Sequence, residues 1–310
     1  MSMVIRKAGA LSTVQDEGRF GVMKTGFGQC GAMDLTSMHI ANRLVGNCIN
    51  CAVIEMTLIG ITAVFNSECI IALSGGDFSA VLSGKHLRCD KAYVVRAGDE
   101  LKIGAAKTGA RCYLAVSGGI DVPKVMGSRS TDIKMGIGGY CGRKLKAGDV
   151  LNFEKNCMTV SNPDKWEIEQ RVFSGNYVLR AVPGPQDFLF PEKTIEKFFG
   201  SEYKVTPECD RMGVRLSGEA LKAKDSVDII SDGIVRGSVQ VPGSGQPIVL
   251  MSDHQTVGGY AKIATVISQD VSLLAQAKPG DKIRFERISV EQAEKLAKKE
   301  KKYLDNLFFW

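Results

Sequence analysis

Histidine is scarce in this chain, with three among 310 residues: His39, His86 and His254. His39 falls in a predicted helix and His86 in a predicted surface turn. His254 directly follows Asp253, and neighbours in a strand point to opposite faces, so the two make a poor catalytic dyad. No GxSxG nucleophile elbow occurs either. The sequence therefore argues against a serine triad.

Several cofactor motifs are also missing. There is no GxxxxGK[ST] loop to hold ATP phosphates and no glycine-rich dinucleotide fingerprint. Cys48 and Cys51 form a lone CxxC after a predicted helix end, and zinc would need two further ligands nearby, so we expect no metal site in this chain. Met23-Lys24-Thr25 does not match a biotin-acceptor lysine between two methionines. Any biotin would have to be carried on another chain.

The chain also lacks long apolar runs and a basic, aromatic-rich stripe. No run approaches the roughly 20 residues of a membrane span, and MSMVIRKAGALSTVQ contains no signal-peptide core. Nine cysteines, an odd number, suit free thiols in a reducing compartment. The net charge of +6 owes much to five lysines between Lys295 and Lys302. We therefore expect a cytoplasmic protein that binds neither nucleic acid nor membrane.

Glycine, in contrast, is abundant, with 34 residues. VRAGDELKI (95–103), LKAGDVLNF (145–153) and AKPGDKIRF (277–285) share a Gly-Asp step followed by alternating apolar residues. Glycine supplies the turn, aspartate caps it, and the alternation buries one face of a strand. The pattern predicts a mainly β fold with a few helices.

A second repeat predicts two related β-domains. IDVP (120–123) precedes GGY (138–140), VQVP (239–242) precedes GGY (258–260), and a Gly-Asp strand follows each. We expect domains at 1–155 and 176–288, a linker at 156–175 and a helical tail at 289–310. Helices are expected at 34–46, with Asp34 as N-cap, at 191–200, and after Ser289, where Ser289 and Gln292 match a capping box.

Four segments combine glycines with polar side chains. Glycines let backbone amides approach a ligand closely, arginine recognises carboxylates, and glutamine and threonine complete an amide-binding set. Each segment alone could be a turn held by an ion pair, but together they suit a small anionic or amide-bearing ligand. Their candidate residues are Gln15, Asp16, Arg19 and Asp34; Ser128, Arg129, Ser130 and Thr131; Asp210, Arg211 and Arg215; and Gln240, Gln246, Asp253, Gln255 and Thr256. The polar run at 252–256 is interpreted as a pocket wall at a barrel mouth.

The motifs TVQDEGRFG, GAMD, GSRSTD, PGPQD, DRMGVRL and QVPGSGQPIVLMSDHQTVGGYAKIATVI closely resemble the biotin-dependent carboxyltransferase family. That family includes allophanate hydrolase subunit 2, KipA proteins, the C subunit of 5-oxoprolinase and half of the carboxyltransferase domain of urea carboxylase. The resemblance implies two cyclophilin-like β-barrel domains and a KipI-like partner, which corresponds to the B subunit of 5-oxoprolinase. Two positions depart from the family pattern, His254 where arginine is common and Ala261 where proline is common.

The branches of this family imply three different functions. The leading one is a component of ATP-dependent 5-oxoprolinase, which opens 5-oxoproline to glutamate with a third protein of the LamB/YcsF type, its A subunit. ATP would then be used by the complex. The second is carboxyl transfer from carboxybiotin to urea or a related amide (urea amidolyase). The third is a KipA-like regulator that binds a kinase inhibitor.

Within a shared site, we hypothesise that Asp16, Asp253 and Arg211 are catalytic. Carboxyl transfer needs a dry pocket with groups that stabilise developing negative charge. Arg129, Arg211 or Arg215 would bind carboxylate, and Gln240, Gln246 and Gln255 would read the amide edge. Backbone amides near Gly258 and Gly259 would support an oxyanion, and Tyr260 would close the wall. The remaining predicted substrate-binding residues are Arg19, Asp34, Ser128, Ser130, Thr131 and Thr256.

Overall fold

The computed structural model describes residues 1–154 and 162–307. Contacts divide the chain into two compact units. Unit 1 comprises Met1–Phe20, Cys30–Phe173 and the residues from Leu304 onward, and unit 2 comprises Gly21–Gln29 and Ser174–Tyr303. The first part of the predicted linker at 156–175, up to residue 161, lies outside the described residues. The last three residues of the predicted tail also lie outside them.

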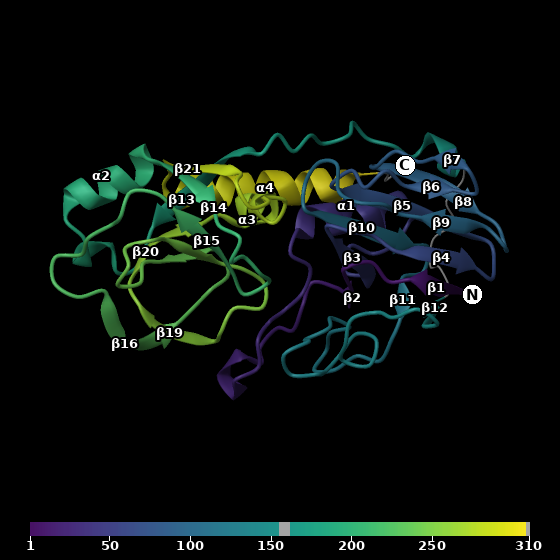
Figure 1. Ribbon diagram of the computed structural model, residues 1–310, viewed down its shortest axis with the longest axis horizontal. Coiled ribbons are helices and arrows are strands. Elements are labelled where there is room, and N and C mark those ends of the chain that lie inside the picture. Colours follow the sequence, from purple (N-terminus) through teal and green to yellow (C-terminus); the bar gives the residue numbers. More distant parts are fainter. Residues whose placement is uncertain (155–161, 308–310) are drawn as a thin grey trace. The chain divides into compact units, whose positions relative to one another are not determined.

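Unit 1 is built from two sheets (Figure 1). The seven-stranded sheet has the order β11 (Ile120–Asp121), β12 (Val150–Phe153), β1 (Ser2–Lys7), β4 (Thr62–Phe65), β9 (Glu100–Lys102), β6 (Val81–Leu82) and β7 (Lys85–His86). The five-stranded sheet has the order β2 (Leu11–Gln15), β3 (Val53–Thr57), β10 (Arg111–Val116), β5 (Cys69–Gly75) and β8 (Lys91–Val95). Side chains from both sheets, among them Ile5, Ile54 and Leu114, form one buried core.

Helix α1 (Leu35–Leu44) packs against β5 and β10. Its Met38, Ala41 and Leu44 are fully buried in a second cluster with Tyr113. The helix begins as predicted, because Asp34 accepts a hydrogen bond from the amide of Ser37 at 2.8 Å. A short 3₁₀ helix, η2 (Pro163–Lys165), contacts β8.

All three Gly-Asp steps form the predicted turn. Gly98, Gly148 and Gly280 each have φ of +92°, a left-handed conformation that favours glycine. The following aspartates accept hydrogen bonds from the amides of Arg96, Lys146 and Lys278, in each case at 2.8 Å. The strands β9, β12 and β21 then begin directly after the turns.

Unit 2 contains a closed barrel of seven strands. In order around the barrel these are β13 (Asn176–Pro183), β20 (Lys262–Val266), β17 (Ser238–Gln240), β18 (Ile248–Leu250), β15 (Gly213–Ser217), β14 (Glu202–Val205) and β21 (Lys282–Arg287). All pairs are antiparallel except β13 with β21, which closes the ring in parallel. The mainly β fold is thus confirmed, with the closed barrel in unit 2.

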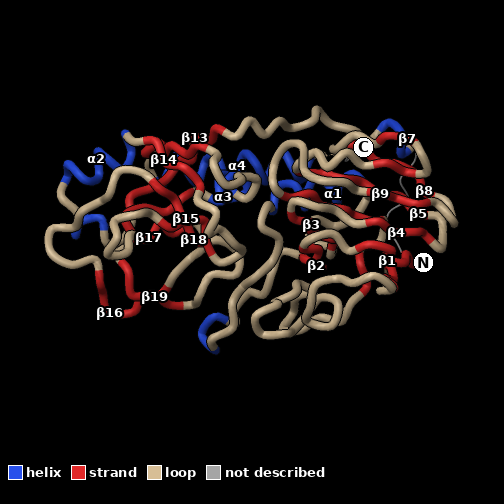
Figure 2. The backbone as a smooth tube through the Cα atoms, in the orientation of Figure 1, coloured by secondary structure: helices blue, strands red, loops and turns tan. Residues whose placement is uncertain are grey.

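Helices flank the barrel, and a separate two-stranded arm leaves it (Figure 2). The arm pairs β16 (Asp228–Gly233) with β19 (Val257–Tyr260). The helices of this unit are η1 (Met23–Thr25), η3 (Asp187–Leu189), α2 (Glu192–Gly200), α3 (Ser268–Leu274) and most of α4 (Val290–Asn306). Phe198 of α2 stacks on Phe285 of β21 with ring centres 4.4 Å apart.

The predicted helices are present, and one more is found. At the start of α4, Ser289 and Gln292 exchange the two hydrogen bonds of a capping box. Helix α3 was not predicted. Arg180 of β13 binds its Asp270, with Nη2 to Oδ1 at 2.6 Å, and Ile267 rather than a polar residue precedes its first turn.

The two GGY segments, which suggested a repeat, have different local structures. Gly138 and Gly139 have φ of +66° and +52°, whereas Gly258 and Gly259 are strand residues of β19.

Eight of the nine cysteines lie among the described residues and are free thiols, as predicted, and Cys157 lies outside them. No helix in the described part of the chain is long and apolar enough to cross a membrane.

The cap of α1 yields a test of stability. Asp34→Ala removes the acceptor for the first turn and should lower the free energy of unfolding by about 0.5–2 kcal/mol. Asp34→Asn should keep most of it, because asparagine also caps well. Urea unfolding followed by circular dichroism measures the change. Asp305→Ala, which removes a half-exposed partner of Arg43, is the matched control, and an equal loss there would contradict the role of the cap.

Candidate functional site

The predicted residues of unit 1 gather around Asp16, which follows β2 and is 8% exposed. Its Oδ1 accepts hydrogen bonds from the hydroxyls of Ser128 at 2.6 Å and Ser130 at 2.5 Å and from the amide of Gly18 at 2.8 Å. Its Oδ2 accepts from the amide of Arg129 at 2.6 Å. Both oxygens are therefore engaged, which suits a carboxylate that holds the 128–130 loop in place.

Arg19 lies in the same cluster and is 1% exposed. Its Nη2 donates a hydrogen bond to the carbonyl of Ser130, while Nε and Nη1 are buried with no partner among the described residues. A Cβ on Gly138 would lie 2.2 Å from that Nη2. A Cβ on Gly139 would lie 1.8 Å from Thr131 Oγ1, so both glycines are needed for this packing.

Four other predicted residues of unit 1 are hydrogen-bonded to partners within that unit. Asp34 caps α1. The guanidinium of Arg129 donates to the carbonyl of Val122 at 2.9 Å and pairs with Glu154. Thr131 donates its hydroxyl to the carbonyl of Val14 at 2.9 Å. Gln15 is buried, and its Nε2 bonds Thr13 and the carbonyl of Thr131.

In unit 2, Arg211 and Asp253 form a bidentate ion pair. Nε of Arg211 lies 2.8 Å from Oδ2, and Nη2 lies 2.9 Å from Oδ1. The amide of Asp253 also bonds the carbonyl of Arg211 at 2.8 Å. The pair extends the contact between β15 and β18 into the adjoining turns. Asp210 accepts bonds from the amides of Met212 and Gly213.

The rest of the polar run has no catalytic geometry. His254 is buried, its Nδ1 donates to the carbonyl of Gln255 at 2.6 Å, and burial lowers its pKa. Gln255 is exposed and Thr256 half-buried. Gly258, Gly259 and Tyr260 belong to β19, with Tyr260 42% exposed.

Four residues form one row across adjacent barrel strands. Arg215 pairs with Ile248, Ile248 with Gln240, and Gln240 with Lys262, with a bulge next to Gln240. Residues directly opposite in antiparallel strands share a face of the sheet, and strands are spaced about 4.8 Å apart. Arg215 is exposed at one end of the row, whereas the adjacent Val214, Val249, Val239 and Ala264 are buried, so we infer that the row lies on the outer face of the barrel. We call it the cross-strand row.

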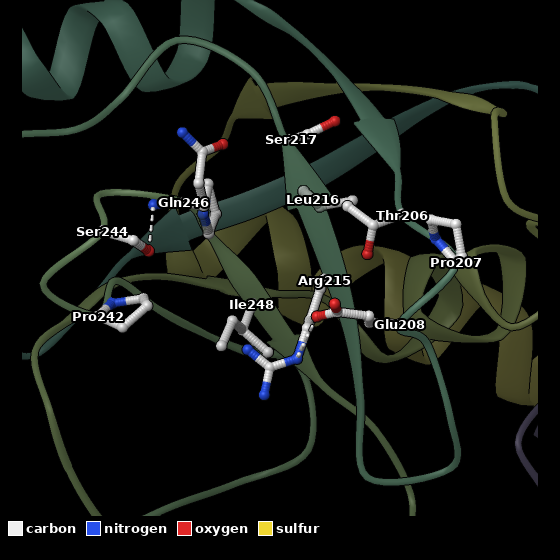
Figure 3. Close-up of a pocket in the computed structure, with 11 residues that line it drawn as sticks. Thr206, Pro207, Glu208, Arg215, Leu216, Ser217, Pro242, Ser244, Gln246 and Ile248 are labelled. Atoms are coloured by element: carbon white, nitrogen blue, oxygen red, sulfur yellow. Dashed lines mark hydrogen bonds and ion pairs between the residues drawn. The ribbon is translucent and has the colours of Figure 1, made fainter.

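The Arg215 end of the row lies in a pocket of about 330 Å³ (Figure 3). Glu208 lies beside Arg215, with Nε to Oε2 at 3.9 Å, and both side chains are solvent-exposed. Gln246 also lines the pocket, but its amide bonds the backbone N–H and carbonyl of Gly218 at 2.8 and 3.2 Å. The other lining residues are Thr206, Pro207, Leu216, Ser217, Pro242, Ser244, Pro247 and Ile248.

The Lys262 end of the row was missed from the sequence. Lys262 is 2% exposed, and its Nζ donates to Asp232 Oδ2 at 2.7 Å and to the carbonyl of Gly233 at 3.0 Å. Gln186, from the PGPQD motif, bonds both Asp232 and the amide of Lys262. The sequence did carry one signal for this residue, since a lysine lies inside the apolar stretch AKIATV. A charge that is buried with its strand requires a partner.

The arrangement offers groups that can bind an anion. No group of three or more metal-ligating side chains occurs in the described part of the chain. Within the cross-strand row the two cations are Arg215, which is exposed, and Lys262, which lies opposite Gln240 with its unpaired amide nitrogen. The cross-strand row therefore offers two separate positions for a small anion, a guanidinium at one end and an ammonium at the other.

Comparison with known proteins agrees with this architecture. The C subunit of 5-oxoprolinase from Escherichia coli (strain K12) is 41% identical over 98% of this chain and 96% of that protein. The C subunit of 5-oxoprolinase from Haemophilus influenzae is 40% identical over 96% of this chain and 94% of that protein. The crystal structure of the K. lactis urea amidolyase matches 99% of this chain with a TM-score of 0.91 and 33% identity, although this chain spans only 20% of it.

The family model of the carboxyltransferase domain, subdomains A and B, matches residues 25–287. That range includes the barrel, the arm and the cross-strand row. The chain therefore belongs to the carboxyltransferase family defined by subdomains A and B.

Proposed function

We propose that the chain is the component of an ATP-dependent 5-oxoprolinase that corresponds to its C subunit, and that the complex opens 5-oxoproline to glutamate. The observation that carries this proposal is the 41% identity to a C subunit of 5-oxoprolinase, which extends over nearly the full length of both proteins. A local motif shared with a larger enzyme would not give such coverage.

The cross-strand row supplies groups suited to this substrate. 5-Oxoproline carries one carboxylate on a small lactam ring. Arg215 is the one cation among the described residues that line the pocket, and proline, leucine and isoleucine side chains provide apolar walls for a ring. We propose that Arg215 makes the initial contact with the substrate carboxylate, since guanidinium groups bind carboxylates bidentately.

The remaining predicted residues are assigned according to their contacts. Asp16 and the Arg211–Asp253 pair, predicted as catalytic, hold their loops through saturated hydrogen bonds. We propose that they act by positioning rather than by proton transfer. Gln240 remains the best candidate to donate a hydrogen bond to a substrate oxygen, because its Nε2 is buried without a partner among the described residues.

The proposal requires other chains. We propose that a KipI-like protein, equivalent to the B subunit, completes the site. A LamB/YcsF-type protein, equivalent to the A subunit, would contribute to turnover, and ATP would be used by the complex. Such an assembly would work in the cytoplasm, and this chain alone would be inactive.

A second candidate is carboxyl transfer to urea or a related amide, with biotin carried on another chain. The likeness to the K. lactis urea amidolyase favours it. In that reaction the same row would face the carboxyl group of carboxybiotin.

One prediction concerns turnover by the reconstituted complex. The full chain, mixed with its KipI-like and LamB/YcsF-type partners, 5-oxoproline and ATP, should release glutamate. Omission of this chain, of either partner or of ATP should abolish release. Glutamate is measured by an enzyme-coupled assay. An intact complex, verified by size-exclusion chromatography, that released none would overturn the proposal and direct the assay to carboxybiotin and urea.

Another prediction concerns Arg215. Its replacement by alanine removes a charged hydrogen-bond partner worth about 1.5–3 kcal/mol, so KM for 5-oxoproline should rise about 10- to 100-fold. The reconstituted complex is assayed at varied 5-oxoproline. Arg284→Ala is the matched control, since Arg284 is an exposed arginine of the same barrel that pairs with Glu202 outside the pocket. Equal KM values for the two variants would rule out the assignment.

A further inference from the structure

The Lys262 end of the cross-strand row holds a buried positive charge with an exposed partner. The Lys262 side chain is 3% exposed, whereas that of Asp232 is 54% exposed. An ammonium has three N–H donors. Two of them bond Asp232 and the carbonyl of Gly233. The hydrogen bond from Lys262 lowers the pKa of Asp232, so the partner is a carboxylate at neutral pH.

Gln240 lies next to Lys262 in this row, and its amide nitrogen is unsatisfied. It is 5% exposed, and Nε2 is buried with no hydrogen-bond partner among the described residues. A buried amide donor without an acceptor costs about 1–3 kcal/mol. Gly258 of the arm makes room for it, since a Cβ there would lie 2.7 Å from that nitrogen. An acceptor atom is therefore the missing partner at this position.

The two sides of this site belong to different elements. Lys262 and Gln240 are on the barrel strands β20 and β17, while Asp232 and Gly258 are on the arm. Five of the six β16 residues are exposed. On the barrel side, Gly184 packs so closely that a Cβ would lie 2.1 Å from the carbonyl of Lys262. Rotation of the exposed Asp232 side chain away from Lys262 would therefore make the ammonium accessible without movement of the barrel strands.

We propose that the Asp232 carboxylate occupies an anion site formed by Lys262 and Gln240, and that the carboxylate of a small ligand replaces it there. The choice of 5-oxoproline and glutamate as ligands rests on the proposed function. The site itself rests on the buried ammonium and the unsatisfied amide.

The exchange preserves the charge balance of the site. A buried ammonium without a counterion would be strongly unfavourable, and one carboxylate takes the place of another. The incoming carboxylate has two acceptor oxygens, so one can bond Lys262 Nζ while the other accepts from Gln240 Nε2. Asp232 does not satisfy Gln240, and this extra bond favours the ligand.

The test is calorimetric titration of the full chain with 5-oxoproline and, separately, with L-glutamate. Asp232→Asn removes the internal competitor and should tighten binding of at least one ligand by about tenfold or more. Gln240→Leu should weaken binding about tenfold. Asp232→Asn/Lys262→Met removes both charges, keeps the interior neutral and should abolish binding. Glu202→Gln, which removes an exposed carboxylate paired with Lys282 and Arg284, is the control and should bind like the original chain.

Each result bears on the proposal. Circular dichroism first verifies that each variant is folded. The proposal is overturned if folded Asp232→Asn binds no more tightly than the original chain, if neither binds, or if the folded double variant binds as well as the original chain. Tighter binding by Asp232→Asn that is lost in the double variant supports it. These outcomes are independent of turnover: glutamate release without an Asp232 effect overturns this inference alone, and an Asp232 effect without glutamate release overturns the proposed function alone.

Discussion

The need to pair the buried ammonium of Lys262 determines much of unit 2. An isolated charge in a protein interior is strongly disfavoured, and this one lies on a strand of the barrel wall. Asp232 and the carbonyl of Gly233 reach it from the arm, and Gln186 forms hydrogen bonds with both Asp232 and the amide of Lys262. Glycines at 184 and 258 let these segments approach closely. Three motifs distant in sequence therefore converge on one charge.

The need to pair buried charges also applies to the other segments that combine glycines with polar side chains. Asp16 is satisfied by the loop at 128–130, and Asp253 by Arg211. These pairs are closed: every carboxylate oxygen has a donor nearby. The cross-strand row differs, because Arg215 has only a distant partner at 3.9 Å and Gln240 Nε2 has none among the described residues. Arg215 and Gln240 therefore keep hydrogen-bonding capacity that the carboxylates of Asp16 and Asp253 lack.

Local rules predicted the parts of the fold that depend on neighbours in sequence. The Gly-Asp turns, the Asp34 cap and the Ser289–Gln292 capping box need only short-range geometry. Helix α3 lacks a polar N-cap and depends on Arg180, some 90 residues away, which binds Asp270, so its local sequence carried little signal. The GGY repeat was ambiguous because its two copies have different structures. The copy at 138–140 forms a turn next to Arg19, and the copy at 258–260 is part of a strand next to Gln240.

The candidate site was only partly predictable for the same reason. Glycines, arginines and glutamines pointed to the right segments, and Arg215 and Gln240 lie in the cross-strand row. The importance of Lys262 depends on strand register, because Gln240 opposite it and Asp232 on the arm give the lysine its role. No spacing rule links these positions. The sequence predicted Asp16 and Asp253 as catalytic carboxylates, because it does not reveal that their oxygens accept hydrogen bonds from nearby protein groups.

The central claim is that a ligand carboxylate takes the place of Asp232 on the barrel. A crystal structure of the full chain with 5-oxoproline or glutamate tests it most directly. The account predicts a ligand carboxylate within hydrogen-bond distance of Lys262 Nζ and Gln240 Nε2, with the Asp232 side chain turned toward solvent. A well-ordered ligand bound elsewhere, with the Lys262–Asp232 pair intact, would contradict it.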